Sequence, residues 1–320
     1  MMKNCCKKIF VILLLSLCIS SSFFIIKTQA SEIPQSAISE VDENPISEKG
    51  RLMKYDKETN TTTEVDMSEV LNTLNNRPKS NYISKDIVSI GESTNIINEN
   101  YPQPLLTDNR VAVGSMINNF PYSAICRINY NGGNGTGVLV GPNLVLTAAH
   151  VVFDKNNNNA KFEDWIAQPK VAGNGSSNTH VGWTQVYYYE NWMNNHNWEY
   201  DIAICVLGEN LGSNPEYQYM HLQYLSDDLL KSLPAIRAVG YADDLQGSFH
   251  QYYSDGKVNS VSTYGFTTSC YTSHGMSGGP VINLETGLLL GVTQGSDGLA
   301  LNQRTARITL DMYNLIISLR

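Results

Sequence analysis

From Val111 onward, the chain is a series of short apolar runs separated by glycine, asparagine and proline. Short runs with turn residues between them are typical of antiparallel sandwiches and barrels. The last stretch differs, because Ile308, Met312, Leu315 and Ile316 recur at helical spacing and predict an amphipathic C-terminal helix. The apolar runs occupy residues 124–129, 137–140, 144–146, 181–188, 202–207, 235–240, 257–262, 280–282 and 287–292.

The sequence Gly-Met-Ser-Gly-Gly-Pro-Val at residues 275–281 places a serine between glycines, on a loop that leads into an apolar run. Glycines allow positive φ and a close approach of the backbone. The hydroxyl of Ser277 can then meet a substrate carbonyl, while the N–H groups of Gly275 and Ser277 point together at a developing oxyanion. Such a loop alone is usually a structural turn, so its interpretation depends on partner residues elsewhere.

Two partner residues precede this loop. Thr-Ala-Ala-His at residues 147–150 ends an apolar run in small residues, which lets the imidazole of His150 lie against the backbone. Asp201 stands before the apolar residues 202–207, where a carboxylate can accept Nδ1–H of a histidine and fix its tautomer. Each residue alone has an ordinary structural explanation. The order His150, Asp201, Ser277, with apolar runs around all three, predicts a catalytic triad for acyl transfer.

The motifs at residues 147–150, 200–204 and 275–281, with Phe-Pro-Tyr-Ser-Ala-Ile at 120–125 and Thr-Ala-Arg-Ile at 305–308, carry a family resemblance. From about residue 108 to the end, the chain resembles the chymotrypsin-fold serine endopeptidases, and among them the bacterial glutamyl endopeptidase (V8-like) branch. The resemblance implies an all-β fold of two six-stranded antiparallel β-barrels. Barrel 1 would span about residues 111–215 and barrel 2 about 216–320, with the triad in the cleft between them and the C-terminal helix on barrel 2.

The implied activity is hydrolysis of peptide bonds through an acyl-enzyme intermediate. The expected partners are protein or peptide substrates, and we expect neither a cofactor nor a catalytic metal. One alternative is a catalytically inactive binding module of the same fold. Another is a narrow-target, exfoliative-type protease whose substrates lack an acidic P1 residue. We also expect a monomer.

The resemblance implies a primary specificity pocket formed by the residues before the nucleophile and by a later strand. Thr272 matches a threonine with which the glutamyl endopeptidases are expected to read a P1 carboxylate. Thr293 stands where that branch carries a histidine, so His274 is the candidate that supplies positive charge instead. A Glu or Asp residue at P1 and a neutral P1 residue both remain open.

The first 110 residues are predicted to be export and processing segments. Residues 1–30 combine an early cluster of lysines, a long apolar stretch and small residues near Ala30, as in a signal peptide. A retained membrane anchor is the alternative, but we favour a secreted, extracellular protein without stable membrane association. Residues 31–110 are predicted to be a largely irregular propeptide, with the mature chain starting near Val111 or near Ile90.

Composition restricts the remaining possibilities. The net charge of −8 argues against nucleic acid as a partner, since binding it calls for a basic face. Three of the six cysteines lie in the predicted signal peptide. We expect Cys126 and Cys205 to be buried free thiols, while the state of Cys270 stays open. The asparagine-rich residues 156–159 predict a surface loop, with a calcium site as the alternative.

Overall fold

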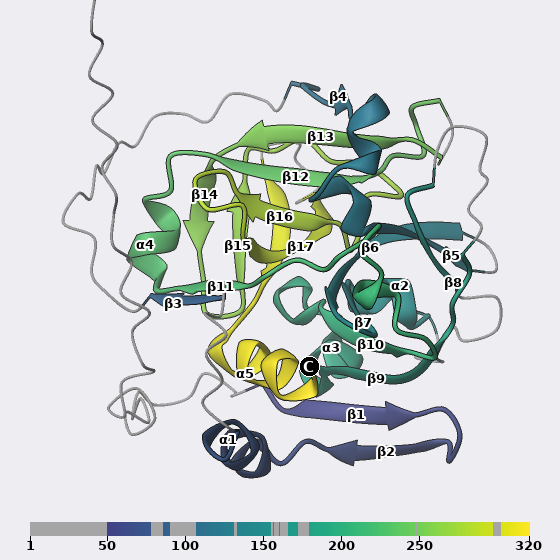
Figure 1. Cartoon of the computed structure of the whole chain (residues 1–320). Helices are drawn as coiled ribbons and strands as arrows, with labels where there is room; N and C mark the ends of the chain where they lie inside the picture. The colour runs from purple at the N-terminus through teal and green to yellow at the C-terminus, as the bar shows by residue number, and fades with distance from the viewer. Residues whose placement is uncertain are drawn as a thin grey trace, which may run out of the picture. The chain divides into compact units, whose positions relative to one another are not determined.

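The structure is a computed structural model. It describes residues 50–77, 86–89, 107–130, 133–154, 156, 160, 166–171, 179–246, 249–296 and 302–320. The predicted signal peptide lies outside these residues, as do the start of the predicted propeptide and most of the asparagine-rich loop. Figure 1 shows two large sheets.

The first sheet contains eight strands in the order β2-β1-β9-β10-β7-β6-β5-β8. Six of them form the first barrel, which closes because Ala167 of β8 and Val181, just before β9, make an antiparallel bridge. The strands of this sheet are β1 (Leu52–Asp56), β2 (Thr61–Glu64), β5 (Ile125–Tyr130), β6 (Gly133–Gly141), β7 (Leu144–Thr147), β8 (Ile166–Pro169), β9 (Trp183–Tyr189) and β10 (Ala203–Leu207).

The second sheet runs in the order β14-β15-β18-β17-β16-β12-β13-β4. Only Lys257 separates β13 from β14, so the two form one bent strand that pairs with β12 along one half and with β15 along the other. This bent strand closes the second barrel and confirms the expected fold class. The strands of the second sheet are β4 (Val111–Ala112), β12 (Ile236–Tyr241), β13 (Gln251–Gly256), β14 (Val258–Val261), β15 (Gly265–Thr268), β16 (Pro280–Asn283), β17 (Leu289–Ser296) and β18 (Gln303–Arg307).

The barrel interiors are filled by the apolar runs that predicted the strands. Ile204 and Cys205 of β10 and Val145 of β7 are completely buried. Cys126, Cys205 and Cys270 are all buried free thiols, which confirms the expectation for the first two. A thiol in such surroundings packs as a small hydrophobic group, and burial raises the pKa of Cys126 and Cys205.

Residues 50–77 depart from the expected irregular segment. β1 pairs antiparallel with β9 and with β2, and α1 (Met67–Asn75) follows, capped by the side chain of Asp66. Leu52 and Val70 are buried, and Gly50 donates its N–H to the hydroxyl of Tyr264 at 2.8 Å. The expectation of a largely irregular segment is therefore wrong for these residues, because a few apolar side chains and a free strand edge suffice to order them.

Barrel 1 was expected to begin at about Val111, but residues 111 and 112 belong to the second sheet. Val111 and Ala112 form β4, which pairs with Tyr253 and Tyr252 of β13 in the second sheet. The chain then crosses to the first barrel, whose earliest strand begins at Ile125. Upstream of β4, β3 (Ile87–Ser89) pairs in parallel with β11 (Gln223–Leu225).

The C-terminal helix, α5 (Leu310–Leu319), forms as predicted but does not cover the second barrel. Its main contacts are with α1, β6 and β11, and Figure 1 shows it beside α1. Tyr189 of β9 and Thr309, the N-cap of the helix, share a hydrogen bond of 2.7 Å. The apolar stripe predicts which face of the helix is buried, but it does not identify the partner. The other α-helices are α2 (Ala149–Val152), α3 (Glu190–Asn195) and α4 (Asp227–Lys231).

Candidate active site

His150 lies in the short helix α2, directly after β7 of the first barrel. The preceding Ala148 and Ala149 are completely buried, so no larger side chain displaces the imidazole from the backbone. The imidazole keeps 15% of its exposure. The small residues that the sequence places before His150 thus allow a histidine at the barrel rim that is supported on one side and open on the other.

Asp201 is fully buried and lies between the short 3-10 helix Trp198–Tyr200 and β10. Its Oδ2 is 2.7 Å from Nδ1 of His150, and its Oδ1 accepts the backbone N–H of His150 at 2.8 Å. Two contacts from one carboxylate fix both the ring and the main chain of His150. A buried carboxylate in this position favours the tautomer with the proton on Nδ1, in which the unprotonated Nε2 can act as a base.

Ser277 lies on the loop between β15 and β16 of the second barrel. Gly275 and Gly278 have φ of +85° and +82°, in the region that favours glycine. A Cβ on Gly278 would meet Oγ1 of Thr147 at 2.1 Å and the carbonyl oxygen of Thr136 at 2.2 Å. The glycines of the motif are therefore required both for the turn and for close contact with the first barrel.

Thr136, which the sequence analysis did not single out, joins this loop to the first barrel. Its backbone N–H donates to the carbonyl oxygen of Ser277 at 2.8 Å, and its hydroxyl donates to the carbonyl oxygen of Gly275 at 2.8 Å. Thr147, three residues before His150, donates its hydroxyl to the carbonyl of Thr136 at 2.7 Å. The Gly-Thr-Gly sequence at residues 135–137 is the local signal that could have revealed this buried junction.

The polar groups around Ser277 are arranged for an incoming ligand. Its hydroxyl is 3.4 Å from the carbonyl oxygen of Gln294, a long contact that a simple rotation about χ1 breaks. Within the described part of the chain, the N–H groups of Gly275 and Ser277 have no hydrogen-bond partner. Their neighbours Met276 and Gly278 instead donate to the carbonyls of Ser273 and Thr293. Two free N–H groups beside a serine hydroxyl can stabilise an oxyanion.

The three predicted pocket residues occupy different environments. The buried Thr272 donates its hydroxyl to Oε1 of Gln303 at 2.6 Å. Thr293, on β17, is also buried and exchanges backbone hydrogen bonds with Gly278 and Gly279 beside the nucleophile loop. His274 is exposed, and its carbonyl oxygen accepts the N–H of Asp243 at 2.9 Å.

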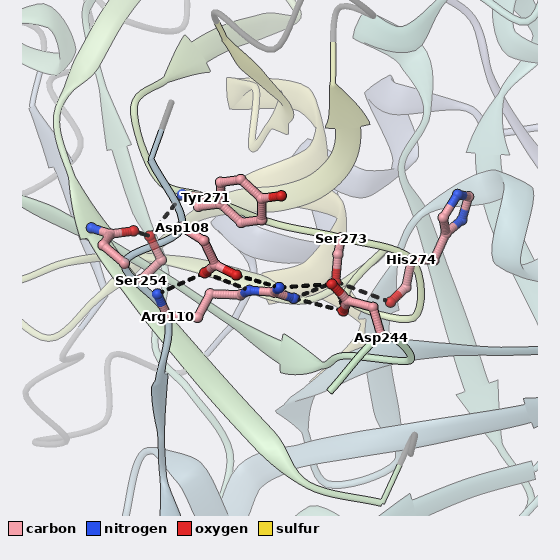
Figure 2. A network of polar contacts seen from close by, with 8 residues as sticks. Asp108, Arg110, Asp244, Ser254, Tyr271, Ser273 and His274 are labelled. Atoms are coloured by element: carbon pink, nitrogen blue, oxygen red, sulfur yellow. Dashed lines mark hydrogen bonds and ion pairs between the residues drawn. The ribbon is translucent and has the colours of Figure 1, made fainter. Parts of the chain in front are cut away.

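A second group of polar residues, all earlier in the chain than Ser277, could not be recognised from the sequence. Arg110, Asp244 and Ser273 form a hydrogen-bonded network, and the imidazole of His274 points away from it (Figure 2). Asp244 and Ser273 lie more than a hundred positions along the chain from Arg110, so no local spacing predicts these contacts. The residues that the structure describes contain no group of three His, Cys, Asp or Glu side chains suited to a metal ion. Nor do they contain a helix long and apolar enough to cross a membrane.

Residues 135–292 match the model of a trypsin-like peptidase domain. The chain is 27% identical over 164 residues to a glutamyl endopeptidase of Bacillus licheniformis, a match that covers 51% of this chain and 49% of that protein. This chain thus aligns with about half the length of that relative. It is also 29% identical over 225 residues to an extracellular metalloprotease of Bacillus subtilis, covering 66% of this chain and 67% of that one.

Solved structures share the fold. One, a Glu endopeptidase in complex with MPD, superposes with a TM-score of 0.56 at 20% identity and covers 67% of this chain and 97% of that chain. The protease Anisep from Arthrobacter nicotinovorans gives a TM-score of 0.50 at 20% identity, covering 61% and 95% of the two chains. At these identities the likeness shows the fold alone. With the matched domain and the curated relative, it identifies a trypsin-like peptidase domain of the chymotrypsin fold, whose model matches residues 135–292 and which is similar to the bacterial glutamyl endopeptidases.

Proposed function

We propose that this protein is a serine endopeptidase in which His150, Asp201 and Ser277 form the catalytic triad. The observation that carries the proposal is the double contact of the buried Asp201 carboxylate with His150, at 2.7 Å and 2.8 Å. A carboxylate in this arrangement holds a histidine in the orientation that a general base requires. The loop of Ser277 is hydrogen-bonded to Thr136 of the first barrel, the barrel that also carries His150 and Asp201. This contact supports a functional relation between Ser277 and the other two residues.

The reaction follows from these roles. Nε2 of His150 takes the hydroxyl proton of Ser277 while Oγ forms a bond to the substrate carbonyl carbon, and the π electrons move to the carbonyl oxygen. The N–H groups of Gly275 and Ser277 stabilise that oxyanion, each by about 3–4 kcal/mol in comparable sites. Collapse of the intermediate breaks the C–N bond, and His150 gives the proton to the leaving amine. Water then repeats the sequence on the acyl-enzyme and releases Ser277.

A serine-directed fluorophosphonate probe tests the proposal. It should form one covalent adduct, mapped to the peptide that contains Ser277, and abolish hydrolysis of an unstructured protein substrate such as casein. Ser277→Ala should remove both labelling and hydrolysis, with turnover lower by several orders of magnitude, since nucleophile and base act as a unit. Ser260→Ala, at an exposed serine of β14, is the matched control and should behave as wild type.

Near-normal casein hydrolysis by a folded Ser277→Ala protein would contradict the triad assignment. Absence of any hydrolysis by the processed wild-type protein would instead support the inactive binding module of the same fold.

For substrate choice, we propose a Glu or Asp residue at P1, supported by the similarity of the chain to the glutamyl endopeptidase of B. licheniformis. An acidic side chain entering a pocket needs hydrogen bonds and a positive partner, because an unpaired buried charge is costly. Thr272 and Thr293 can offer hydroxyls, and the exposed His274 at the start of the loop can offer charge. His274→Ala should lower kcat/KM for Glu substrates by about ten- to a hundredfold relative to uncharged ones. Equal cleavage after Glu and after neutral residues by the wild type would favour the neutral-P1 alternative.

We also propose export and processing, with residues 1–30 as the signal peptide and a propeptide that begins at residue 31 and ends near Ile90, the upstream one of the two expected start sites. The polar composition of residues 31–110 and the small residues near Ala30 support a signal peptide followed by a propeptide. Sequencing the N-terminus of the protein recovered from the culture medium tests it, since an intact residue 1 in an active, membrane-bound protein would contradict export.

A further inference from the structure

Residues 108–110 attach to the second barrel through one arginine side chain. Arg110 directly precedes β4, and its side chain keeps only 1% of its exposure. Nε and Nη2 donate to the carboxylate of Asp108 at 2.9 Å and 2.7 Å, and Nη1 and Nη2 donate to that of Asp244 at 2.7 Å each. Nη1 also donates to Oγ of Ser273 at 2.5 Å. Figure 2 shows the guanidinium held between the two carboxylates.

The same segment contacts the chain on the other side of Ser273. The guanidinium of Arg110 lies 4.9 Å from the ring centre of Tyr271, within range of a cation–π contact. Oδ1 of Asn109 accepts a hydrogen bond from the hydroxyl of Ser254 at 2.6 Å. The oxygen of that hydroxyl accepts a hydrogen bond from the N–H of Tyr271 at 2.7 Å. Residues 108–110 therefore hold residues 271–273 both directly and through Ser254.

What these contacts hold is the segment that leads into the nucleophile. Ser273 donates its hydroxyl to Asp244 at 2.6 Å, and its carbonyl oxygen accepts the N–H of Met276, the residue before Ser277. Thr272, a candidate pocket residue, lies between the two anchored positions. A shift of about 1 Å in such a segment can lower a rate by about a hundredfold, so its support bears on function.

Arginine is suited to this task in a way that lysine is not. Its planar fork carries several donors in fixed directions, and it pairs with two carboxylates and a hydroxyl at the same time. Asp108 and Asp244 keep 43% and 47% of their side-chain exposure. Because solvent weakens ion pairs at such exposed carboxylates, the pairs with Arg110 add little to the stability of the fold. The contribution we expect is geometric: three chain segments meet at one rigid group.

We propose that Arg110 is a positioning residue for the primary specificity pocket, acting through Ser273 and Tyr271 on the geometry of residues 271–274. This proposal rests on the proposed endopeptidase function. It has a consequence for processing, since the active enzyme must retain Arg110. The N-terminus of the active form then lies upstream of Asp108, and cleavage of the Arg110–Val111 bond is not the activating event.

The chain offers a matched control for the experiment. Arg237 makes an equivalent fork with Asp255, at 2.6 Å and 2.7 Å, and lies 3.9 Å from the ring centre of Tyr253. This pair joins β12 to β13, and the hydrogen bonds and ion pairs of Arg237 within the described residues go to Asp255 and Tyr122, not to residues 271–274. Arg110→Met and Arg237→Met thus remove similar ion pairs and similar ring contacts, and only the first should alter the pocket.

We would measure kcat and KM for the processed enzyme on peptides that differ only at P1, together with Tm. Arg110→Met should lower kcat/KM on the preferred peptide by about ten- to a hundredfold and reduce discrimination among P1 residues. Arg110→Lys should restore only a small part of this loss. Arg237→Met should lower Tm by a similar amount and leave P1 discrimination unchanged.

A second variant covers the case in which Arg110→Met does not fold. Ser273→Ala leaves both ion pairs in place, removes the hydroxyl that links them to the loop, and should reproduce the loss of P1 discrimination with a smaller change in Tm. Unchanged discrimination in an active Ser273→Ala enzyme, or active enzyme whose mass shows a start at Val111, would overturn the positioning role alone. A wild-type enzyme without hydrolytic activity would overturn the proposed function and this inference together.

Discussion

The two barrels hold their shares of the candidate site by different means. In the first, His150 is fixed by a fully buried carboxylate that contacts both its ring and its backbone. In the second, Ser277 lies on a glycine-rich turn whose flank is held by the ionic contact of the buried Arg110 side chain with the half-exposed Asp244. The proposed base is thus positioned by burial, whereas the proposed nucleophile and the candidate pocket residues before it are positioned by backbone conformation and by charge.

The upstream chain extends both barrels, again by different means. Strand β1 joins the first sheet through backbone pairing with β9 and buries Leu52. Strand β4 pairs with the second sheet along only two residues, and the side chains of Arg110 and Asn109 supply further attachment. The comparison predicts that disturbing the first attachment changes stability, while disturbing the second changes selectivity.

The largest effect is expected at the buried carboxylate. Asp201→Asn keeps the size of the side chain, but the amide no longer favours the tautomer of His150 with its proton on Nδ1. We expect a folded protein whose kcat at neutral pH is lower by about three to four orders of magnitude. Steady-state kinetics on a peptide substrate measures this, with circular dichroism as the control for folding. Activity within tenfold of wild type would show that another acid supports His150.

The next effect is expected on the nucleophile turn. Gly278→Ala places a Cβ at a residue with φ of +82°, within 2.2 Å of backbone and side-chain oxygens of the first barrel. The strained conformation and the displaced junction together should cost more than about 3 kcal/mol of unfolding free energy and abolish hydrolysis. Gly287→Ala is the control, since φ there is +71° but no atom lies within 4 Å of the added Cβ. Denaturant unfolding of both variants separates the cost of backbone strain from the cost of the lost contact with the first barrel. Equal losses of unfolding free energy in the two variants would contradict the role of that contact.

The difference between the barrels also explains what could be predicted from the sequence. His150, Asp201 and Ser277 were predictable because each stands in a short local motif beside an apolar run. Strand β2 was not, since Thr61–Glu64 is polar and fully exposed and the strand depends on β1 for its partner. Arg110 was missed because its contacts follow from the folded positions of residues far apart in the chain. Local chemistry was therefore predictable, whereas attachment between distant segments was not.

A smaller effect is expected where β1 joins the first barrel. Leu52 keeps 3% of its exposure, and Leu52→Ala should lower the unfolding free energy of the unprocessed chain by about 2–3 kcal/mol. Thr63→Ala on the exposed strand β2 is the control and should change it by less than about 0.5 kcal/mol. Chemical denaturation of the full chain measures both. A Leu52→Ala protein as stable as wild type would mean that β1 is not part of the cooperative unit.

The smallest effect concerns the charge of the network at the second barrel. Hydrogen bonds from Arg110 hold the pKa of Asp244 well below its usual range. A carboxylate whose pKa is lower in the folded state stabilises that state above its ordinary pKa, and this stabilisation is lost as the pH falls through the lowered value. Because Asp244 is half-exposed, we expect Asp244→Asn to lower the unfolding free energy by less than about 1 kcal/mol at pH 7. The difference from wild type should stay constant down to about pH 5 and shrink only in stronger acid, where Asp244 becomes protonated in both states. Urea unfolding at several pH values measures this. A difference that already disappears between pH 7 and pH 5 would show that another group, not the Asp244 carboxylate, carries the charge that Arg110 requires.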